Sequence, residues 1–394
     1  MNLWLFDLDG VLIHPGGYRE ALRRTVAHFS RAAGYPERHL DESTIEAFEA
    51  QGITCEWDIA GICLMADFFT MWKANPTLHL PPDLAGGLGA LHSADLIRPE
   101  PDYAYWAHRV GAFGGETPSA SALKTFKQEA GHADEDMARL GEFDAVLGLV
   151  LGHPREFARS PVMQYFQQFT LGSRAYAQQY GVTPVLETPS LLAELDRPGI
   201  SPAARDRILV LQAEKRIHSV IITARPCRPQ AAGDNLADYP PEAEIAQKVL
   251  GLENLPLVGA GHMQWLARQH GQISDGYLKP SPVHSLAALA LALGEKENAA
   301  LEAARVFVEE GKILPPLDSL KQTGASVTIF EDSPTGVIGT QSAVDLLKRK
   351  NLDVRISILG VAAGGEKRAV LQSLGAEVFG TTDESLERAW KTLE

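Results

Sequence analysis

The residues that most constrain this chain are Leu3 to Gly10, which read LWLFDLDG. The four apolar residues Leu3 to Phe6 predict a strand that is buried on both faces, as in a parallel sheet. Asp7 comes where such a strand ends, and Asp9 and Gly10 follow in a tight turn. Open α/β sheets bind ligands at the carboxyl ends of their strands, so both acids are placed for chemistry. The alternative is a buried strand that ends in a solvated acidic turn.

The composition is that of an ordinary globular protein. The 394 residues are 45% hydrophobic and 22% charged, which is enough for two or more domains. Lys and Arg total 36 against 50 Asp and Glu, so the net charge is −14, and no basic run interrupts this balance. We therefore expect no binding to nucleic acid or to an anionic membrane.

Cysteine usage and hydropathy favour a cytoplasmic protein. The 3 cysteines form no C-x-x-C pair, so a reducing compartment is expected, with neither a disulfide framework nor a structural zinc site. The first apolar run has no basic segment before it and stops at Asp7, unlike a secretion signal. The longest apolar stretches, near Ile59–Ala66 and Leu286–Leu293, are too short to span a bilayer.

From the flexible joint Pro15-Gly16-Gly17 to about residue 200, the pattern is helical and has no convincing alternating strand. Helices are predicted near Leu22–Ala33, Thr44–Ala50, Glu56–Trp72, Ser121–Glu129, Ala133–Leu151 and Met163–Tyr180. A turn-rich joint at Arg197 to Pro202 ends this region. The region therefore predicts a second, mostly helical domain.

Beyond this joint, short apolar strands alternate with helices, which predicts a parallel sheet covered on both faces. The predicted strands are Ser219–Thr223, Leu255–Gly259, Ser326–Phe330, Val354–Leu359 and Glu377–Phe379. The predicted helices are Ala203–Lys215, Ala243–Leu250, Pro282–Leu293, Lys296–Glu310, Val337–Lys350 and Glu366–Leu374. The first strand has no other β partner nearby, so it joins this sheet. We predict an α/β fold: a Rossmann-like parallel sheet from residues 1–15 and 203–394, with a large α-helical domain of residues 16–202 inserted.

Polar residues follow the predicted strands of the second half. Thr223 closes the strand SVIIT, and Ala224 and Arg225 come next. A hydroxyl and free backbone N–H groups at a strand end suit a phosphate group. Capping of the next helix by the hydroxyl is the alternative.

A lysine and two acids stand in similar positions. Lys279 precedes a predicted helix start at Ser281-Pro282, where a lysine is usually solvated. Glu331 and Asp332 follow the strand SVTIF and precede a second Ser-Pro pair. Acids near a helix N-terminus can simply complement the helix dipole, which is the alternative to a functional role.

Taken together, these residues supply what phosphoryl transfer to a carboxylate needs. Two unit negative charges about 4 Å apart repel by roughly 4 kcal/mol at an effective dielectric constant near 20, so a cation is required. Lys279 provides one fixed positive charge. The hard oxygen ligands that Mg²⁺ prefers come from Asp7, Asp9, Glu331 and Asp332.

Four motifs in this order resemble those of the haloacid dehalogenase superfamily. DLDG resembles the first motif, Thr223 the second, Lys279-Pro280 the third, and EDSPTG (Glu331 to Gly336) the E-D-S-x-x-G form of the fourth. This form and the insertion point resemble the subfamily of β-phosphoglucomutase and many small-metabolite phosphatases, whose helical cap enters just after the first motif. The resemblance covers about residues 1–15 and 203–394.

The resemblance implies a role for each residue. Asp7 would be the nucleophile that forms an aspartyl-phosphate. Asp9 would protonate the leaving oxygen and then activate water, and its presence argues against a true dehalogenase. Thr223 would hold the transferring phosphoryl group, and Lys279 would neutralise Asp7 and the phosphate. The implied Mg²⁺ site consists of Asp7, the backbone carbonyl of Asp9, Asp332 and, in support, Glu331.

Further residues are candidates for substrate contacts. Arg225 can grip an anion bidentately, so the predicted phosphate- or substrate-binding set is Thr223, Ala224, Arg225 and Lys279. His14 stands where relatives often carry an Asp, with a solvated hinge histidine as the alternative. In the inserted domain the candidates are Glu56-Trp57-Asp58 and His153-Pro154-Arg155, for which surface positions are the alternative. Gly259 to Gly261 are expected to form a loop at a strand end.

We therefore predict a Mg²⁺-dependent phosphatase that acts on a small phosphorylated metabolite. One alternative is a phosphomutase, which returns the phosphoryl group to a bound intermediate. The other is a non-catalytic binding or regulatory protein on the same fold, against which the intact acids and Lys279 count. The segments 226–278 and 295–325 are longer than the subfamily usually shows, so no relative's substrate is transferred to this chain.

Overall fold

The computed structural model describes residues 1–36, 38, 40–93, 95–111, 117–131, 137–154, 156–233, 236–294 and 296–393. The chain forms two compact units: unit 1 comprises Met1–Gly16 and Leu195–Glu394, and unit 2 comprises Gly17–Glu194. The second boundary therefore lies at Leu195, eight residues before the predicted position 203. The difference arises because strand β3 (Arg197–Pro198) already pairs with β2 (Ile13–His14) of unit 1.

Unit 1 is built on a parallel sheet. In its described residues the sheet has six strands in the order β5-β4-β1-β6-β7-β8, and each neighbouring pair runs parallel. The strands are β1 (Asn2–Asp7), β4 (His218–Ile222), β5 (Leu257–Val258), β6 (Ala325–Glu331), β7 (Val354–Val361) and β8 (Glu377–Phe379). The predicted fold class, a parallel α/β sheet with a large helical insertion, is confirmed.

The side chains of β1 alternate between two hydrophobic clusters. Leu3 and Leu5 belong to one cluster, whereas Trp4 and Phe6 belong to the other. This follows because successive side chains of a strand point to opposite faces of the sheet. Burial on both faces is what the apolar run predicts.

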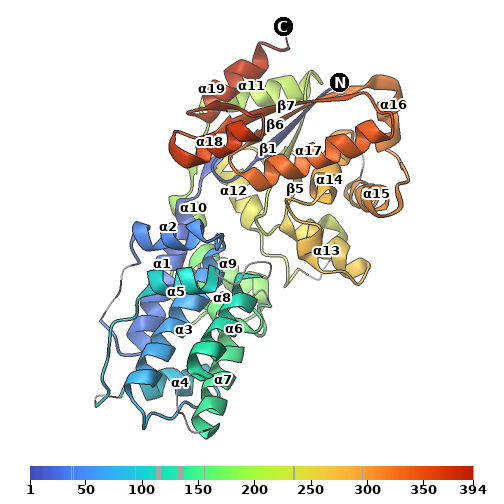
Figure 1. Ribbon diagram of the computed structural model, residues 1–394. Helices are drawn as coiled ribbons and strands as arrows, with labels where there is room; N and C mark the ends of the chain where they lie inside the picture. Colours follow the sequence, from blue (N-terminus) through green and yellow to red (C-terminus); the bar gives the residue numbers. More distant parts are fainter. Residues whose placement is uncertain are drawn as a thin grey trace. The chain divides into compact units, whose positions relative to one another are not determined.

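Helices cover both faces of the sheet, and Figure 1 shows α11 and α19 on one side and α14, α15 and α17 on the other. The cluster that contains Leu3 also draws on α13 (Ala260–Gln269), α14 (Pro282–Ala292), α15 (Glu297–Glu310), α16 (Leu320–Thr323), α17 (Pro334–Arg349) and α18 (Gly365–Ser373). The cluster that contains Trp4 draws on α11 (Pro202–Ala213), α12 (Glu242–Leu250) and α19 (Thr382–Trp390). Three short 3₁₀ helices connect these elements: η1 (Gln230–Ala232), η2 (Ser274–Gly276) and η3 (Leu317–Ser319).

Two Ser-Pro pairs begin helices near the residues of interest. Ser281 caps α14 by accepting a hydrogen bond from the backbone N–H of Val283, and Ser333 caps α17 by accepting one from Gly336. In both helices a proline occupies the first turn, where its missing N–H costs nothing. The segments that carry Lys279 and Asp332 therefore end at defined helix starts.

Unit 2 is helical in its described residues. Its elements are α1 (Gly16–Ala32), α2 (Glu42–Ala50), α3 (Glu56–Ala74), α4 (Leu84–Leu91), α5 (Tyr103–Gly111), α6 (Pro118–Gly131), α7 (Met137–Leu151), α8 (Pro161–Leu171), α9 (Ser173–Tyr180) and α10 (Leu191–Leu195), of which α1 begins and α10 ends at the border with unit 1. Helix α3 is buried along most of its length, and Trp72 on it stacks on Phe143 with ring centroids 4.9 Å apart. The aromatic residues of α3 thus form part of the core of this unit.

Several predicted elements differ from those observed. The predicted helix Met163–Tyr180 is two helices, because Gly172 adopts a φ of 77° between α8 and α9. The expected loop at Gly259 to Gly261 is instead the start of α13, at Ala260. The predicted start at Ala133 of another helix lies outside the described residues, and α7 is described from Met137.

Helices in the described part of the chain are too short, or not apolar enough, to cross a membrane.

Phe330 provides a test of how the face of the sheet that carries Trp4 and Phe6 is stabilised. Its fully buried ring stacks on Phe6 at 4.5 Å and lies 5.4 Å from Trp4. We expect Phe330→Ala to lower the free energy of unfolding by about 3–5 kcal/mol, because it leaves a cavity between aromatic rings. Chemical denaturation measures this change. The control Ile338→Ala, at a side chain in α17 that is 40% exposed, should stay within about 0.5 kcal/mol of the wild type.

Candidate active site

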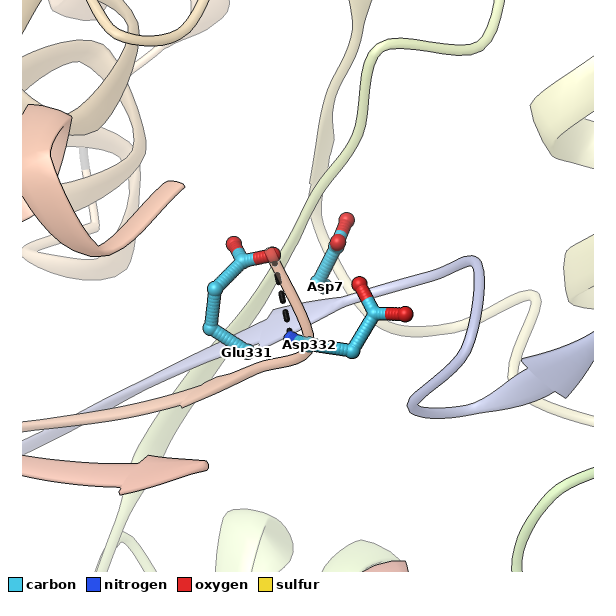
Figure 2. Close-up of side chains that lie close together, drawn as sticks. All are labelled: Asp7, Glu331 and Asp332. Carbon is cyan, nitrogen blue, oxygen red and sulfur yellow. Dashed lines mark hydrogen bonds between the residues drawn. The ribbon is translucent and has the colours of Figure 1, made fainter. Parts of the chain in front are cut away.

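Three carboxylates gather at the carboxyl ends of two neighbouring strands. Asp7 is the last residue of β1, Glu331 is the last residue of β6, and Asp332 follows it. Each contributes a carboxylate oxygen to a group whose members lie within 4.8 Å of one another. Figure 2 shows these side chains and the hydrogen bond from the Asp332 backbone N–H to Glu331. The sheet order explains the meeting, because β1 and β6 are adjacent and parallel.

Lys279 places its ammonium group between two of these carboxylates. Its Nζ lies 2.9 Å from Oδ1 of Asp7 and 2.8 Å from Oε2 of Glu331. The side chain is 6% exposed, so the ion pairs are shielded from water. Because Lys279 contacts two carboxylates, it keeps a charged partner when one of them is neutralised.

The Glu331 carboxylate is saturated by donors of its own loop. Its Oε1 accepts hydrogen bonds from the backbone N–H of Asp332 (3.2 Å) and Ser333 (3.1 Å) and from the Ser333 hydroxyl (2.8 Å). A Cβ on Gly336 would lie 1.7 Å from Oε2, so this position has no room for a side chain. The spacing of the EDSPTG motif is thus explained by the packing around one carboxylate.

Asp9 lies in a tight turn after β1. The backbone N–H of Gly10 donates to the carbonyl of Ile13 (2.8 Å), and that of Ile13 donates to Leu8 (2.8 Å). Gly10 has a φ of 74°, and a Cβ there would lie 1.9 Å from Oδ2 of Asp332. Both the backbone conformation and the close approach therefore require glycine.

Burial and charge set the protonation of the cluster. Burial, with the nearby negative charge of Glu331, raises the pKa of Asp7 well above its ordinary value, and Lys279 only partly offsets this. Burial also opposes ionisation of Glu331, but Lys279 and the hydrogen bonds it accepts hold its pKa below the ordinary value. Burial lowers the pKa of Lys279, but its two carboxylate partners outweigh this and raise it.

Asp332 is paired with a lysine that the sequence did not suggest. Its Oδ2 accepts a hydrogen bond from Nζ of Lys367, near the start of α18. Burial raises the pKa of Asp332 to about 6, while Lys367 acts in the opposite direction. The Lys367 side chain is 50% exposed, so this ion pair lies at the water-facing edge of the cluster. No local pattern distinguishes Lys367 from other lysines at helix starts.

Thr223 and Ala224 directly follow β4, the strand beside β1. Thr223 is fully buried, and its hydroxyl oxygen accepts a hydrogen bond from the backbone N–H of Arg225 (3.0 Å). Its own N–H donates to the carbonyl of Val258 (3.0 Å). Ala224 is exposed. The Thr223 hydroxyl thus stabilises the turn that follows β4, whether or not it also contacts a ligand.

Arg225 is held by two carboxylates of its own unit, and its contact with a substrate anion stays a prediction. Its guanidinium is 1% exposed and forms ion pairs with Asp9 and Asp196. Nε lies 3.0 and 2.9 Å from the two carboxylate oxygens of Asp9, and Nη1 lies 2.7 Å from Oδ2 of Asp196. Asp196 drew no attention in the sequence, because it stands alone in a turn-rich joint.

The side chains of Cys227, His262 and Glu297 form a largely buried row next to the turn that follows β4. Nδ1 of His262 is 3.0 Å from Sγ of Cys227 and accepts a hydrogen bond from the Gly259 N–H (3.1 Å). Nε2 of the same ring lies 3.1 Å from Oε2 of Glu297. These contacts fix the segment after Thr223 against α13 and α15.

The remaining candidates make contacts within their own units. His14 is exposed on β2, where it pairs with Arg197. Asp58 is buried in unit 2 and accepts a hydrogen bond from the Ser119 hydroxyl, and His153 lies 3.0 Å from Glu156. Arg155 lies outside the described residues.

The cluster fits a divalent cation. In the part of the chain that the structure describes, Asp7, Glu331 and Asp332 form the group of side chains able to hold a metal ion. Carboxylate oxygens are the ligands that Mg²⁺ prefers. Glu331 has its oxygens occupied by the loop and by Lys279, so Asp7 and Asp332 are the members best placed to contact an ion.

Comparisons with known proteins agree with this fold. Neither a protein-family model nor a curated protein sequence matches the chain. An X-ray structure of a Northeast Structural Genomics Consortium target is 14% identical, with a TM-score of 0.66, over 100% of this chain and 99% of the other. At this identity, the likeness establishes the fold alone.

Two structures with names that suggest an activity are less similar. A Thermotoga maritima protein assigned as a β-phosphoglucomutase is 16% identical over 99% of both chains, with a TM-score of 0.40. Phosphatase Tt82 from Thermococcus thioreducens is 15% identical over 95% of this chain and 99% of its own, also with a TM-score of 0.40. Both likenesses have a TM-score below 0.5, so they say nothing about the activity of this chain.

Asp7→Asn tests the electrostatics of the cluster without any ligand. Because the pKa of Asp7 is raised above 3.8 in the folded state, the stability linked to its proton is present below that value and lost as the pH rises through the folded pKa. The ionised carboxylate therefore costs stability at neutral pH, and the amide removes this cost while Lys279 keeps Glu331 as a partner.

We expect Asp7→Asn to melt at or above the wild-type temperature near pH 7 and to lose this advantage towards about pH 4. Thermal melts across this range measure the difference. The control Asp206→Asn, at a side chain that is 63% exposed, should show little change at any pH. A loss of about 2 kcal/mol or more for Asp7→Asn at neutral pH would contradict the expectation.

Proposed function

We propose that this chain, which has the α/β fold of the haloacid dehalogenase superfamily, is a Mg²⁺-dependent phosphohydrolase of small phosphorylated metabolites that works through an aspartyl-phosphate. One observation is the main support for this proposal. At the carboxyl ends of adjacent parallel strands, Asp7 lies close to Lys279 and to the Glu331–Asp332 pair. Ligands of such sheets bind at this edge.

The proposed nucleophile is Asp7. An Oδ atom of Asp7 would attack phosphorus and form an O–P bond while the bond from phosphorus to the alcohol oxygen breaks. The carboxylate must be ionised to attack, whereas burial and Glu331 favour its protonated form. Lys279, 2.9 Å away, supplies part of the compensating charge. Substrate phosphate would bring further negative charge to the site, so a second cation is expected.

Mg²⁺, held by Asp7 and Asp332 with the backbone carbonyl of Asp9, would supply this positive charge and shield the phosphate oxygens when bound. Glu331 supports the site indirectly, because the hydrogen bonds that it accepts orient Lys279 and the Asp332 backbone. Lys367 would have to give up its contact with Asp332 as the cation binds. Its half-exposed side chain can do so at little cost.

Asp9 is the proposed acid and base. Its side chain is 35% exposed, so it is accessible from solvent although its partner Arg225 is buried. Asp9 would give a proton to the departing alcohol oxygen and then take one from the water that hydrolyses the aspartyl-phosphate. The Thr223 hydroxyl, at the end of the strand next to β1, is proposed to contact the transferring phosphoryl group.

We assign selection of the substrate to the inserted unit 2. Helical caps inserted after the first motif serve this purpose in the subfamily that the sequence resembles. In this unit Glu56-Trp57 and His153-Pro154 remain candidates for the contacts, whereas Asp58 is buried and accepts a hydrogen bond from Ser119. A small phosphorylated metabolite is proposed because the motifs resemble those of small-metabolite phosphatases and the net charge of −14 disfavours nucleic acid.

Release of inorganic phosphate tests the proposal. We expect the purified protein with Mg²⁺ to hydrolyse members of a broad panel of phosphate esters. Asp7→Asn should lower kcat by about a thousandfold or more, because the nucleophile is lost. Asp206→Asn, an exposed change in the same unit, is the control and should keep full activity. No turnover across the panel would refute the function, turnover by Asp7→Asn would refute the nucleophile, and isomerised product without phosphate would identify a phosphomutase.

Binding of Mg²⁺ is a separate prediction. Calorimetric titration of the wild type should show Mg²⁺ binding, and chelation should abolish phosphate release. Asp332→Asn should weaken Mg²⁺ binding by about tenfold or more, since it removes one of few charged ligands. Asp206→Asn again serves as the control. Unchanged Mg²⁺ affinity in Asp332→Asn would exclude this carboxylate from the metal site.

A further inference from the structure

Arg225, Asp9 and Asp196 form a largely buried network, and each of them comes from a different segment of unit 1. Asp9 lies in the turn after β1, Asp196 lies just before β3, and Arg225 lies in the turn after β4. The guanidinium is 1% exposed and the Asp196 carboxylate is fully buried, whereas the Asp9 carboxylate is 35% exposed. The network thus has a rigid, dry interior and ends in a carboxylate that solvent can reach.

The contact between Arg225 and Asp9 restrains orientation as well as distance. Nε of Arg225 approaches both carboxylate oxygens of Asp9, at 3.0 and 2.9 Å, and Nη2 donates to one of them. A planar guanidinium that engages a carboxylate with two nitrogens opposes its rotation, which the single ammonium of a lysine cannot do. Asp9 is therefore held in one rotational position.

Asp196 fixes the other side of the guanidinium. Its Oδ2 accepts from Nη1 of Arg225 at 2.7 Å. The next residue, Arg197, begins β3, which pairs with β2, and the N–H of Gly199 donates to the carbonyl of Leu12 (2.7 Å). Asp196 is thus attached to the short ribbon that closes the turn containing Asp9.

The backbone of Arg225 is held as firmly as its side chain. Its N–H donates to the Thr223 hydroxyl (3.0 Å), and its carbonyl accepts from Ala260 at the start of α13 (2.9 Å). A Cβ on Gly259, the residue before this helix, would lie 2.9 Å from the same carbonyl. Backbone and guanidinium are both fixed, so Arg225 provides a stable support for Asp9.

We propose that Arg225 is a positioning residue for Asp9, and that Asp196 acts through Arg225 in the same way. The inference rests on the proposed function, because it gives Asp9 the role of acid and base. Asp9 must reach the leaving oxygen along a defined direction, and misplacement of a catalytic group by about 1 Å can cost about a hundredfold in rate. The buried network removes the need to order this side chain at each turnover.

The effect of the leaving group on kcat/KM distinguishes a residue that positions Asp9 from one that only stabilises the fold. The alcohol oxygen of an alkyl phosphate such as glycerol phosphate needs a proton to depart, whereas p-nitrophenolate leaves without one. We compare kcat/KM for the two substrates, since this constant reports the step that releases the alcohol. Two variants are used. Arg225→Lys keeps the positive charge but loses the two-nitrogen contact with Asp9, and Asp196→Asn keeps the size of the side chain but removes its negative charge. Asp9→Asn is the reference for loss of the acid.

We expect Arg225→Lys to lower kcat/KM for the alkyl phosphate about 10- to 100-fold more than for p-nitrophenyl phosphate. Asp196→Asn should show the same selective loss at a smaller size, and the inhibition constant for inorganic phosphate should not change. The matched control is Arg305→Lys. Arg305 also pairs with carboxylates, those of Glu302, Glu309 and Glu310, and its side chain is 11% exposed, yet it is not part of the site. This control should affect the two substrates equally, if at all.

Two results of the activity measurements would overturn the inference. Equal losses on both substrates in Arg225→Lys would mean a structural role, and weaker inhibition by inorganic phosphate would mean that Arg225 contacts the substrate. A double-mutant cycle of Asp9→Asn and Arg225→Lys, measured by equilibrium unfolding, tests the pairing without any activity. We expect the two losses to be non-additive, and additive losses would also overturn the inference. Absence of turnover in the wild type would instead overturn the proposed function, before any variant is compared.

Discussion

The site depends on one ammonium group placed between two buried carboxylates. Asp7 and Glu331 end adjacent strands, and their negative charges repel each other in a region to which water has little access. Two such charges about 4 Å apart repel by roughly 4 kcal/mol at an effective dielectric constant near 20. Lys279 contacts both at 2.8–2.9 Å and so makes the arrangement tolerable. The residual imbalance, visible in the raised pKa of Asp7, is what a bound cation would relieve.

The strand order explains why distant segments meet at this point. β1 lies between β4 and β6, so the residues that follow these three parallel strands converge at one edge of the sheet. The helical unit 2 is inserted between β2 and β3, and pairing of these two short strands returns the chain to the site where it left. Asp196 sits at this return point, which lets it contact Arg225 although unit 2 separates it from β1 in the sequence.

Local patterns predicted the strands and the meeting of the acids, but not the partners of the charged side chains. The apolar run before Asp7 and the acids after SVTIF place both groups at strand ends, and the parallel alternation then brings them together. The position of Arg225 beside Thr223 suits a substrate anion, and this contact stays a prediction. Its contact with Asp196 could not be predicted, because it depends on β2 and β3, which have two residues each and therefore no detectable period. Lys367 was missed for a similar reason, since only the fold brings α18 to Asp332.

The two adjacent acids of the fourth motif have different tasks because their surroundings differ. Glu331 points into the protein, where backbone N–H groups, the Ser333 hydroxyl and Lys279 use its oxygens. Gly336 is required there, since any Cβ would collide with the same carboxylate. Asp332 faces Gly10 and has a half-exposed lysine as its partner, so an ion can compete for it. A swap of the two acids would therefore fail on both counts, because the shorter side chain cannot reach the donors around Glu331 and the longer one has no room beside Gly10.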